Sequence, residues 1–140
     1  MTSVVLAFLL FTSCAAVAQQ KNQVRVLVFD GAAVGERTLR PASEVASRVF
    51  ARQGIQTRWM LCCSPSAECQ PLDRTDLIVR VLPSAAQLPV SRTAHGMALQ
   101  AEDGRPATHA AVFLDRTTYT ARTANSPVTD VLAHVMAHEV

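Results

Sequence analysis

The chain has 140 residues, of which 49% are hydrophobic and 17% charged, and its formal net charge at pH 7 is +2. This length corresponds to one domain with an ordinary core, so a multi-domain organisation is unnecessary. The thirteen basic and eleven acidic residues are spread along the sequence without a basic run, which argues against a nucleic-acid partner.

The N-terminal segment has the pattern of an export signal. Residues 4–11 (VVLAFLLF) form an apolar run that is too short to span a bilayer, and residues 16–18 (AVA) supply the small-residue pattern of a signal-peptidase site. We therefore expect residues 1–18 to be a signal peptide and residues 19–140 to be the mature domain. The expected location is outside the cell or in the periplasm.

A second interpretation of the same segment involves Cys14. Residues 11–14 (FTSC) resemble the lipobox of bacterial lipoproteins, in which the cysteine is acylated and anchors the protein to the envelope. Phenylalanine stands where leucine is favoured in that motif, so simple export is the preferred interpretation. A membrane partner is expected only if Cys14 is lipidated.

The first part of the mature chain predicts a strand followed by a helix. Residues 24–30 (VRVLVFD) are mostly β-branched and apolar, which is typical of a central strand buried on both faces. Apolar residues then recur at helical spacing over residues 45–53. Thr38 is the predicted N-cap of this helix, Pro41 lies in its first turn, and Gly54 ends it.

The next segments predict further strands. Residues 55–62 (IQTRWMLC) and 75–82 (TDLIVRVL) have strand composition, and residues 96–100 and 110–114 are expected to pair around the turn residues 102–104. With the final helix described below, the predicted fold class is mixed α/β, with a mixed sheet of about five strands and two main helices.

Three cysteines follow the predicted leader: Cys62, Cys63 and Cys69. Residues 64–68 (SPSAE) between them are turn-like. In an oxidising compartment the favoured interpretation is one short disulfide. A zinc site is disfavoured, because adjacent cysteines cannot present both sulfurs to one metal as easily as a C-x-x-C pair. The spacing leaves open whether Cys62 or Cys63 pairs with Cys69.

The last segment predicts the most explicit helix of the chain. Ser126 is the predicted N-cap, Pro127 takes the first helical position, and Asp130 lies in the first turn. Glu139 falls in the middle of the apolar stripe of this helix, and a buried acid must be protonated, paired or close to a metal. The stripe consists of Val128, Val131, Leu132, Val135 and Met136.

Residues 138–140 (HEV) match the first three positions of H-E-x-x-H, in which two histidines one turn apart bind zinc. In that motif the glutamate is the general base for a water that zinc acidifies. His134 lies one turn before His138, so the two histidines could bind zinc together as an H-x-x-x-H pair. The favoured interpretation is that His134 is an ordinary helix histidine that borders the cleft of the active site. His95 and His109 are interpreted as surface residues.

Together, the capped helix, its acidic stripe position and the α/β domain before it resemble the N-terminal lobe of the zincin metallopeptidases, especially the metzincin-like group. Residues 132–140 (LAHVMAHEV) look like the zinc helix of that family. The remaining chain resembles secreted bacterial proteins whose chains end in a complete H-E-x-G-H helix. The resemblance is carried by residues 24–30, 51–62, 77–83 and 111–116.

This resemblance implies the N-terminal part of an exported zinc metallopeptidase that hydrolyses peptide bonds in a peptide or protein substrate. It implies a Zn²⁺ cofactor, His138 as a metal ligand and Glu139 as the catalytic base. It also implies that Cys62 pairs with Cys69, and that residues 96–100 form the edge strand that aligns the substrate backbone. The other zinc ligands and the second wall of the cleft are absent from these 140 residues, so this chain is expected to bind zinc weakly and to be inactive.

The competing hypothesis is a secreted, non-catalytic α/β binding domain in which the His138-Glu139 pair is accidental.

Overall fold

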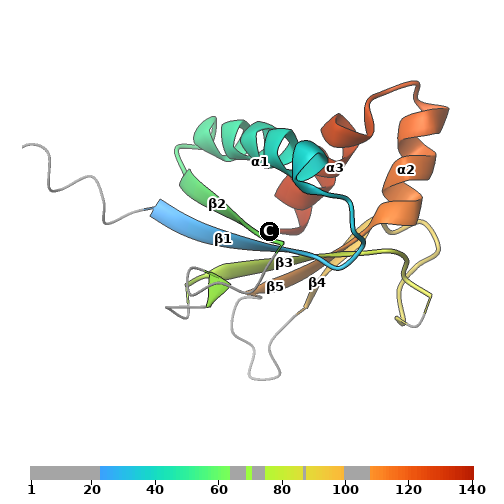
Figure 1. The fold of residues 1–140 in the computed structure, drawn as a ribbon, viewed down its shortest axis with the longest axis horizontal. Helices are drawn as coiled ribbons and strands as arrows, with labels where there is room; N and C mark the ends of the chain where they lie inside the picture. Colours follow the sequence, from blue (N-terminus) through green and yellow to red (C-terminus); the bar gives the residue numbers. More distant parts are fainter. Residues whose placement is uncertain (1–22, 64–68, 71–74, 87, 100–107) are drawn as a thin grey trace, which may run out of the picture.

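The computed structural model describes residues 23–63, 69–70, 75–86, 88–99 and 108–140 (Figure 1). The predicted signal peptide, Cys14 and the turn at residues 102–104 lie outside the described residues. The elements in chain order are β1 (Gln23–Asp30), α1 (Glu36–Ala51), β2 (Gln56–Cys62), β3 (Leu77–Leu82), β4 (Gly96–Leu99), β5 (His109–Phe113), α2 (Leu114–Thr123) and α3 (Val128–Glu139).

The five strands form one mixed sheet in the order β2-β1-β3-β5-β4. Four strands run parallel, and β4 pairs antiparallel with β5 at one edge. This confirms the predicted α/β class, the five strands and the pairing of the last two. The strand bounds agree with the predicted ranges to within two residues.

The prediction of a buried central strand is confirmed for β1, which lies between β2 and β3. Val26, Leu27 and Val28 are fully buried although they alternate between the two faces of the sheet. A parallel strand with neighbours on both sides and cover on both faces requires such a continuous apolar run.

All three helices lie on the same side of the sheet in Figure 1. Valines from β1, β3 and β5 meet apolar side chains from α1 and α3 there, and this cluster is the main core of the domain. Its buried members are Val26, Val28, Leu39, Ala42, Val79, Val81, Val112, Leu132, Ala133 and Met136. The opposite face of the sheet has two smaller apolar clusters, one around Leu27 and the other around Phe113.

The predicted N-cap of the first helix was wrong. Helix α1 begins at Glu36 and its N-cap is Gly35, whose φ is 88°. The carboxylate of Asp30 accepts hydrogen bonds from the backbone N–H groups of Val34 and Gly35, so the end of β1 organises the turn into the helix. Pro41 consequently lies inside the helix, beyond its first turn.

The end of α1 agrees with the prediction. Gly54 has a φ of 77°, and its N–H donates to Ala51 O while the N–H of Ile55 donates to Phe50 O. These two bonds form the turn that commonly ends a helix with a glycine in the left-handed conformation.

The described residues form three helices where the sequence predicted two main ones, and the additional one is α2. Its sequence LDRTTYTART is rich in threonine and lacks a clear apolar stripe. Thr117 and Thr123 each donate a hydroxyl hydrogen bond to the carbonyl four residues earlier, a pattern that threonines adopt inside helices. Helix α2 follows β5 directly, so no turn residue marked its beginning.

The N-cap of the last helix also differs from the prediction. Pro127 is the N-cap of α3, one residue later than predicted, and Ser126 makes no cap; its hydroxyl bonds Ala124 O. Asp130 lies in the first turn, as predicted. Among the described residues, no helix is long and apolar enough to cross a membrane.

Candidate functional site

Helix α3 carries the candidate catalytic residues in its last turn. Its buried side, with Leu132, Ala133 and Met136, packs into the main core and fixes the rotation of the helix. Glu139 lies three residues after Met136, so it extends the same side of the helix beyond the buried part. The predicted position of Glu139 on the apolar stripe is therefore confirmed, and its side chain is half-buried.

The side chain of Glu139 lies against the edge strand β4. A Cβ atom built on Gly96 would be 2.6 Å from Glu139 Cγ and 2.9 Å from Glu139 Cδ. Gly96 pairs with Val112, which faces the main core, so Gly96 is on the helix side of the sheet. The carboxylate-bearing end of α3 thus reaches β4 at the one position in that strand that has no side chain.

The two histidines of α3 lie on its solvent side. His134 and His138 are both exposed and are one helical turn apart, as predicted. No group of three His, Cys, Asp or Glu side chains that could hold a metal ion occurs among the described residues. A zinc ion needs three protein donors in a catalytic site. The described part of the chain therefore supplies an incomplete set, His138 with His134 at most.

A small hollow lies where the end of α3 meets the sheet. It is bordered by Glu139 and Val140 from the helix end, by Leu77 and Ile78 from β3, and by residues 108–110 at the start of β5. His109 is exposed, as predicted, and Thr108 Oγ1 lies 3.0 Å from its Nδ1. The hollow places Glu139 next to an open surface rather than inside the core.

Two side chains of α2, Arg116 and Thr120, hold the segment that leads into β4, and the sequence did not predict these contacts. Arg116 of α2 donates hydrogen bonds from Nη1 to Ser91 O (2.6 Å) and Ala94 O (2.5 Å), in the segment that leads into β4. His95 Nε2 lies 2.6 Å from Thr120 Oγ1, also of α2. His95, interpreted from the sequence as a surface residue, is half-buried, with this contact on one side.

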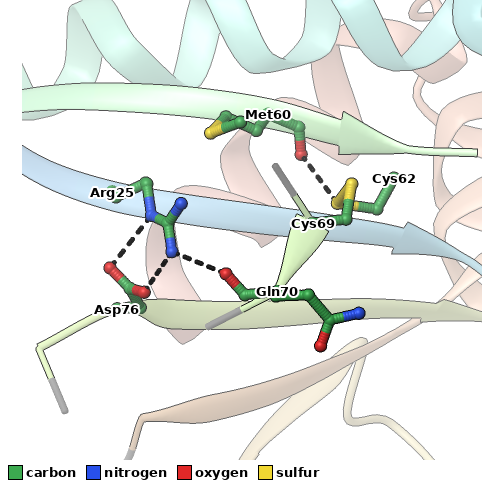
Figure 2. The surroundings of a disulfide bond; sticks show 6 residues. All are labelled: Arg25, Met60, Cys62, Cys69, Gln70 and Asp76. Carbon is green, nitrogen blue, oxygen red and sulfur yellow. Dashed lines mark hydrogen bonds and ion pairs between the residues drawn. A yellow bond between two sulfur atoms is a disulfide. The ribbon is translucent and has the colours of Figure 1, made fainter. Parts of the chain in front are cut away.

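The predicted disulfide is present at the opposite edge of the sheet. Cys62 at the end of β2 is bonded to Cys69, and Cys63 is a free, exposed thiol. Figure 2 shows Arg25 beside this bridge, where it donates to Asp76 and to the backbone carbonyl of Gln70. The hydrogen bonds that Arg25 donates to the Asp76 carboxylate raise the pKa of Arg25. The disulfide is thus structural and lies apart from His138 and Glu139.

A larger hollow lies between α1 and β2, away from α3. Its lining contains hydroxyl, charged and aromatic side chains but no histidine or cysteine, so it adds little to a zinc site. The lining residues are Arg40, Ser43, Glu44, Ser47, Thr57, Trp59 and Leu61. Ser43 Oγ is buried without a hydrogen-bond partner among the described residues.

Comparisons of this chain with protein-family models, with curated proteins and with solved structures found no match. The functional interpretation therefore depends on the last turn of α3 and on its position beside β4. The sequence identified His138, Glu139 and the edge strand separately. The contact between Glu139 and Gly96 was missed, although a glycine inside a strand often marks a close approach by another group.

Proposed function

We propose that this chain is the N-terminal part of an exported, zinc-dependent metallopeptidase that hydrolyses peptide bonds. The observation that carries the proposal is the position of Glu139, at the end of a well-packed helix and against the antiparallel edge strand β4. The adjacent His138 is exposed and free to bind a metal ion. The disulfide supports an exported location, because such bonds persist in oxidising compartments.

In the proposed enzyme, His138 would hold the zinc ion together with ligands from outside these 140 residues. The bound ion would supply Lewis-acid chemistry, polarising a peptide carbonyl and acidifying water. The role of Glu139 is to accept a proton from the attacking water and to pass it to the leaving amine. Its half-buried position on Gly96 limits the orientations of its carboxylate.

Strand β4 has the geometry to align a substrate. It pairs with β5 on one side, and no other described strand pairs with it. An extended peptide could therefore add to its open edge through backbone hydrogen bonds. A peptide bound in this way would pass the end of α3, close to Glu139.

The first test is to read the coding sequence beyond codon 140. The proposal expects an in-frame histidine two codons after Val140, followed by sequence for the second wall of the cleft. The longer protein should bind one zinc ion per chain, measured by elemental analysis, and should cleave peptides. A frame that stops directly after codon 140 contradicts the proposal.

The second test uses Glu139→Gln in the longer protein. The amide cannot accept a proton and leaves His138 intact, so turnover should fall by about 100-fold or more while the zinc content stays at one per chain. Asp130→Asn is the matched control, because Asp130 is an exposed acid in the first turn of the same helix. Unchanged turnover in the Glu139→Gln variant would show that the assignment of the catalytic base is wrong.

A second candidate function, a non-catalytic binding domain, is favoured by the hollow between α1 and β2. A buried hydroxyl without a partner, such as that of Ser43, is uncommon in folded proteins and suits a polar ligand atom. This function predicts that the reading frame stops after codon 140 and that the protein does not bind zinc.

A further inference from the structure

Gly96 occupies a position where a glycine needs an explanation. Strand β4 has only four residues, and a glycine inside a strand weakens it through the entropy lost on folding. The described glycines with positive φ are Gly35 and Gly54, so the backbone conformation of Gly96 does not require glycine. The reason must therefore be the space around its Cα atom.

That space is already filled by two neighbours. A Cβ atom at position 96 would lie 2.6 Å from Glu139 Cγ, and it would also lie 2.6 Å from the backbone oxygen of Ala111. Distances below 3.0 Å are not found for real Cβ atoms, so one of the neighbours would have to move. The Ala111 oxygen belongs to β5 and is held by the sheet, whereas Glu139 is in the last turn of α3. A side chain at position 96 would therefore displace Glu139 or push β4 away from β5.

We propose that Gly96 is a positioning residue for Glu139. The missing side chain allows the stem of Glu139 to rest directly on β4, which fixes the distance between the carboxylate and the open edge of that strand. This inference rests on the proposed function for its catalytic meaning. The contact itself, however, is a property of the chain in hand and is testable without zinc.

The next residues on the same side of the sheet extend this arrangement. Ala98 of β4 is paired with Ala110 of β5, and Ala110 borders the hollow beside Glu139. Two alanines thus follow Gly96 on the surface below the end of α3. Of the described glycines, only Gly96 lies in direct conflict with the Glu139 stem when a Cβ is added.

The first experiment is a double-mutant cycle in the 140-residue chain, with Gly96→Ala and Glu139→Ala, followed by urea unfolding. Gly96→Ala should raise the unfolding equilibrium constant by about tenfold, because overpacking at this site forces a shift of β4 or of α3. In the Glu139→Ala background the same change should cost at least about threefold less, since only the conflict with Ala111 remains. Equal costs in both backgrounds overturn the inference.

The matched control is Gly31→Ala. A Cβ atom there would lie 3.0 Å from Val81 O and 3.6 Å from Leu82 Cδ2, with no contact to α3. Its effect on the unfolding constant should be the same with and without the Glu139 side chain. A coupling of Gly31 to Glu139 as large as that of Gly96 would also overturn the inference, because the effect would then not be specific to the contact.

A second measurement covers the case in which Gly96→Ala does not fold. Glu139→Ala alone keeps the native glycine, and it should shift the backbone amide resonance of Gly96 and accelerate hydrogen exchange in β4. Asp130→Ala, at the other end of α3, should leave both unchanged. An unshifted Gly96 resonance in the Glu139→Ala variant overturns the contact.

The catalytic meaning is tested in the longer protein. Gly96→Ala should lower kcat by about 10- to 100-fold, the cost of a misplaced catalytic group, while the zinc content and KM change little. Gly31→Ala should leave kcat unchanged. A change in KM alone, with kcat unchanged, would overturn the positioning role. If the longer protein binds no zinc and cleaves nothing, the proposed function fails, and the coupling experiment still decides the contact between Gly96 and Glu139.

Discussion

The two edges of the sheet are held by different means. At one edge, β2 is a seven-residue strand that runs parallel to β1 along its whole length and ends in the Cys62–Cys69 disulfide. At the other edge, β4 has four residues, pairs antiparallel with β5 and has side-chain contacts from α2 and α3. The contacts from α2 are polar, from Arg116 and from Thr120 through His95, whereas the contact from α3 is the packing of the Glu139 stem on Gly96.

The more stable edge of the sheet is not the edge that carries the candidate site. A disulfide and apolar burial stabilise the β2 edge with little dependence on any one helix end. Strand β4 has four register pairs with β5, against seven between β2 and β1, so fewer backbone hydrogen bonds hold the β4 edge and it is the less firmly held of the two. It is also the edge that Glu139 contacts, and binding sites are commonly found in such less stable regions. An added strand or a second lobe at the proposed site would therefore stabilise β4, the less stable edge strand.

The largest expected effect comes from removing the Cys62–Cys69 disulfide at the β2 edge. Replacing both Cys62 and Cys69 by alanine should lower the free energy of unfolding by about 2 to 3 kcal/mol, because the bridge closes a short loop and restricts the unfolded chain only modestly. Urea denaturation under non-reducing conditions measures the change.

Cys63→Ser is the matched control, because Cys63 is an exposed free thiol next to the bridge. It should change the free energy of unfolding by less than about 0.5 kcal/mol. A loss as large as that of the double alanine variant would show that Cys63, rather than Cys62, stabilises this edge.

The sequence predicted the β2 edge more completely than the β4 edge, for a physical reason. Strands β1, β2 and β3 are encoded by local runs of apolar residues, and helix α1 ends at Gly54 with the expected left-handed turn. The helix beginnings were less predictable. Asp30 organises the start of α1 from the preceding strand, so Thr38, the better local candidate, is bypassed.

The second expected effect is at the β4 edge. Arg116→Ala removes the two hydrogen bonds to Ser91 O and Ala94 O, and it should lower the free energy of unfolding by about 1.5 kcal/mol. The amides of β4 should exchange with solvent faster, while those of β2 keep their rates. Hydrogen exchange followed by mass spectrometry measures both.

Arg122→Ala serves as the control, because Arg122 is an exposed arginine in the last turn of the same helix. Equal acceleration of β2 and β4 amides in the Arg116→Ala variant would mean that the two edges are not held independently, and the contrast between them would fail.

The candidate site could be predicted only in part, because it is assembled from distant segments. The His138-Glu139 pair and its helix position follow from local spacing. The support of β4 by α2 does not, since α2 is rich in threonine and has no apolar stripe to mark it as a helix. The contact of Glu139 with Gly96 joins residues that are far apart in the chain, and only the fold brings them together.

The smallest expected effect concerns the protection of the Cys62–Cys69 disulfide against attack by the Cys63 thiol. Partial burial, followed by the negative charges of Asp30 and Glu36, raises the pKa of the Cys63 thiol. A thiol attacks a disulfide as its thiolate, so a raised pKa keeps Cys63 protonated at neutral pH and slows exchange with the neighbouring bridge. As the pH rises through this raised pKa, the thiolate forms and exchange of Cys62 for Cys63 in the bond to Cys69 should accelerate.

The rate of Cys63 alkylation by iodoacetamide, measured against pH, tests this protection. Its midpoint should lie above that of a cysteine in a short peptide, about 8.5. Glu36→Gln should lower the midpoint slightly, because it removes one of the two charges, whereas Asp30 must be kept since its carboxylate accepts the N–H groups of Val34 and Gly35. A midpoint at or below that of the peptide would mean that the fold gives the Cys63 thiol no such protection. Exchange would then replace the Cys62–Cys69 bond by a Cys63–Cys69 bond with release of the Cys62 thiolate, and the stability of the β2 edge could no longer be assigned to the Cys62–Cys69 bond alone.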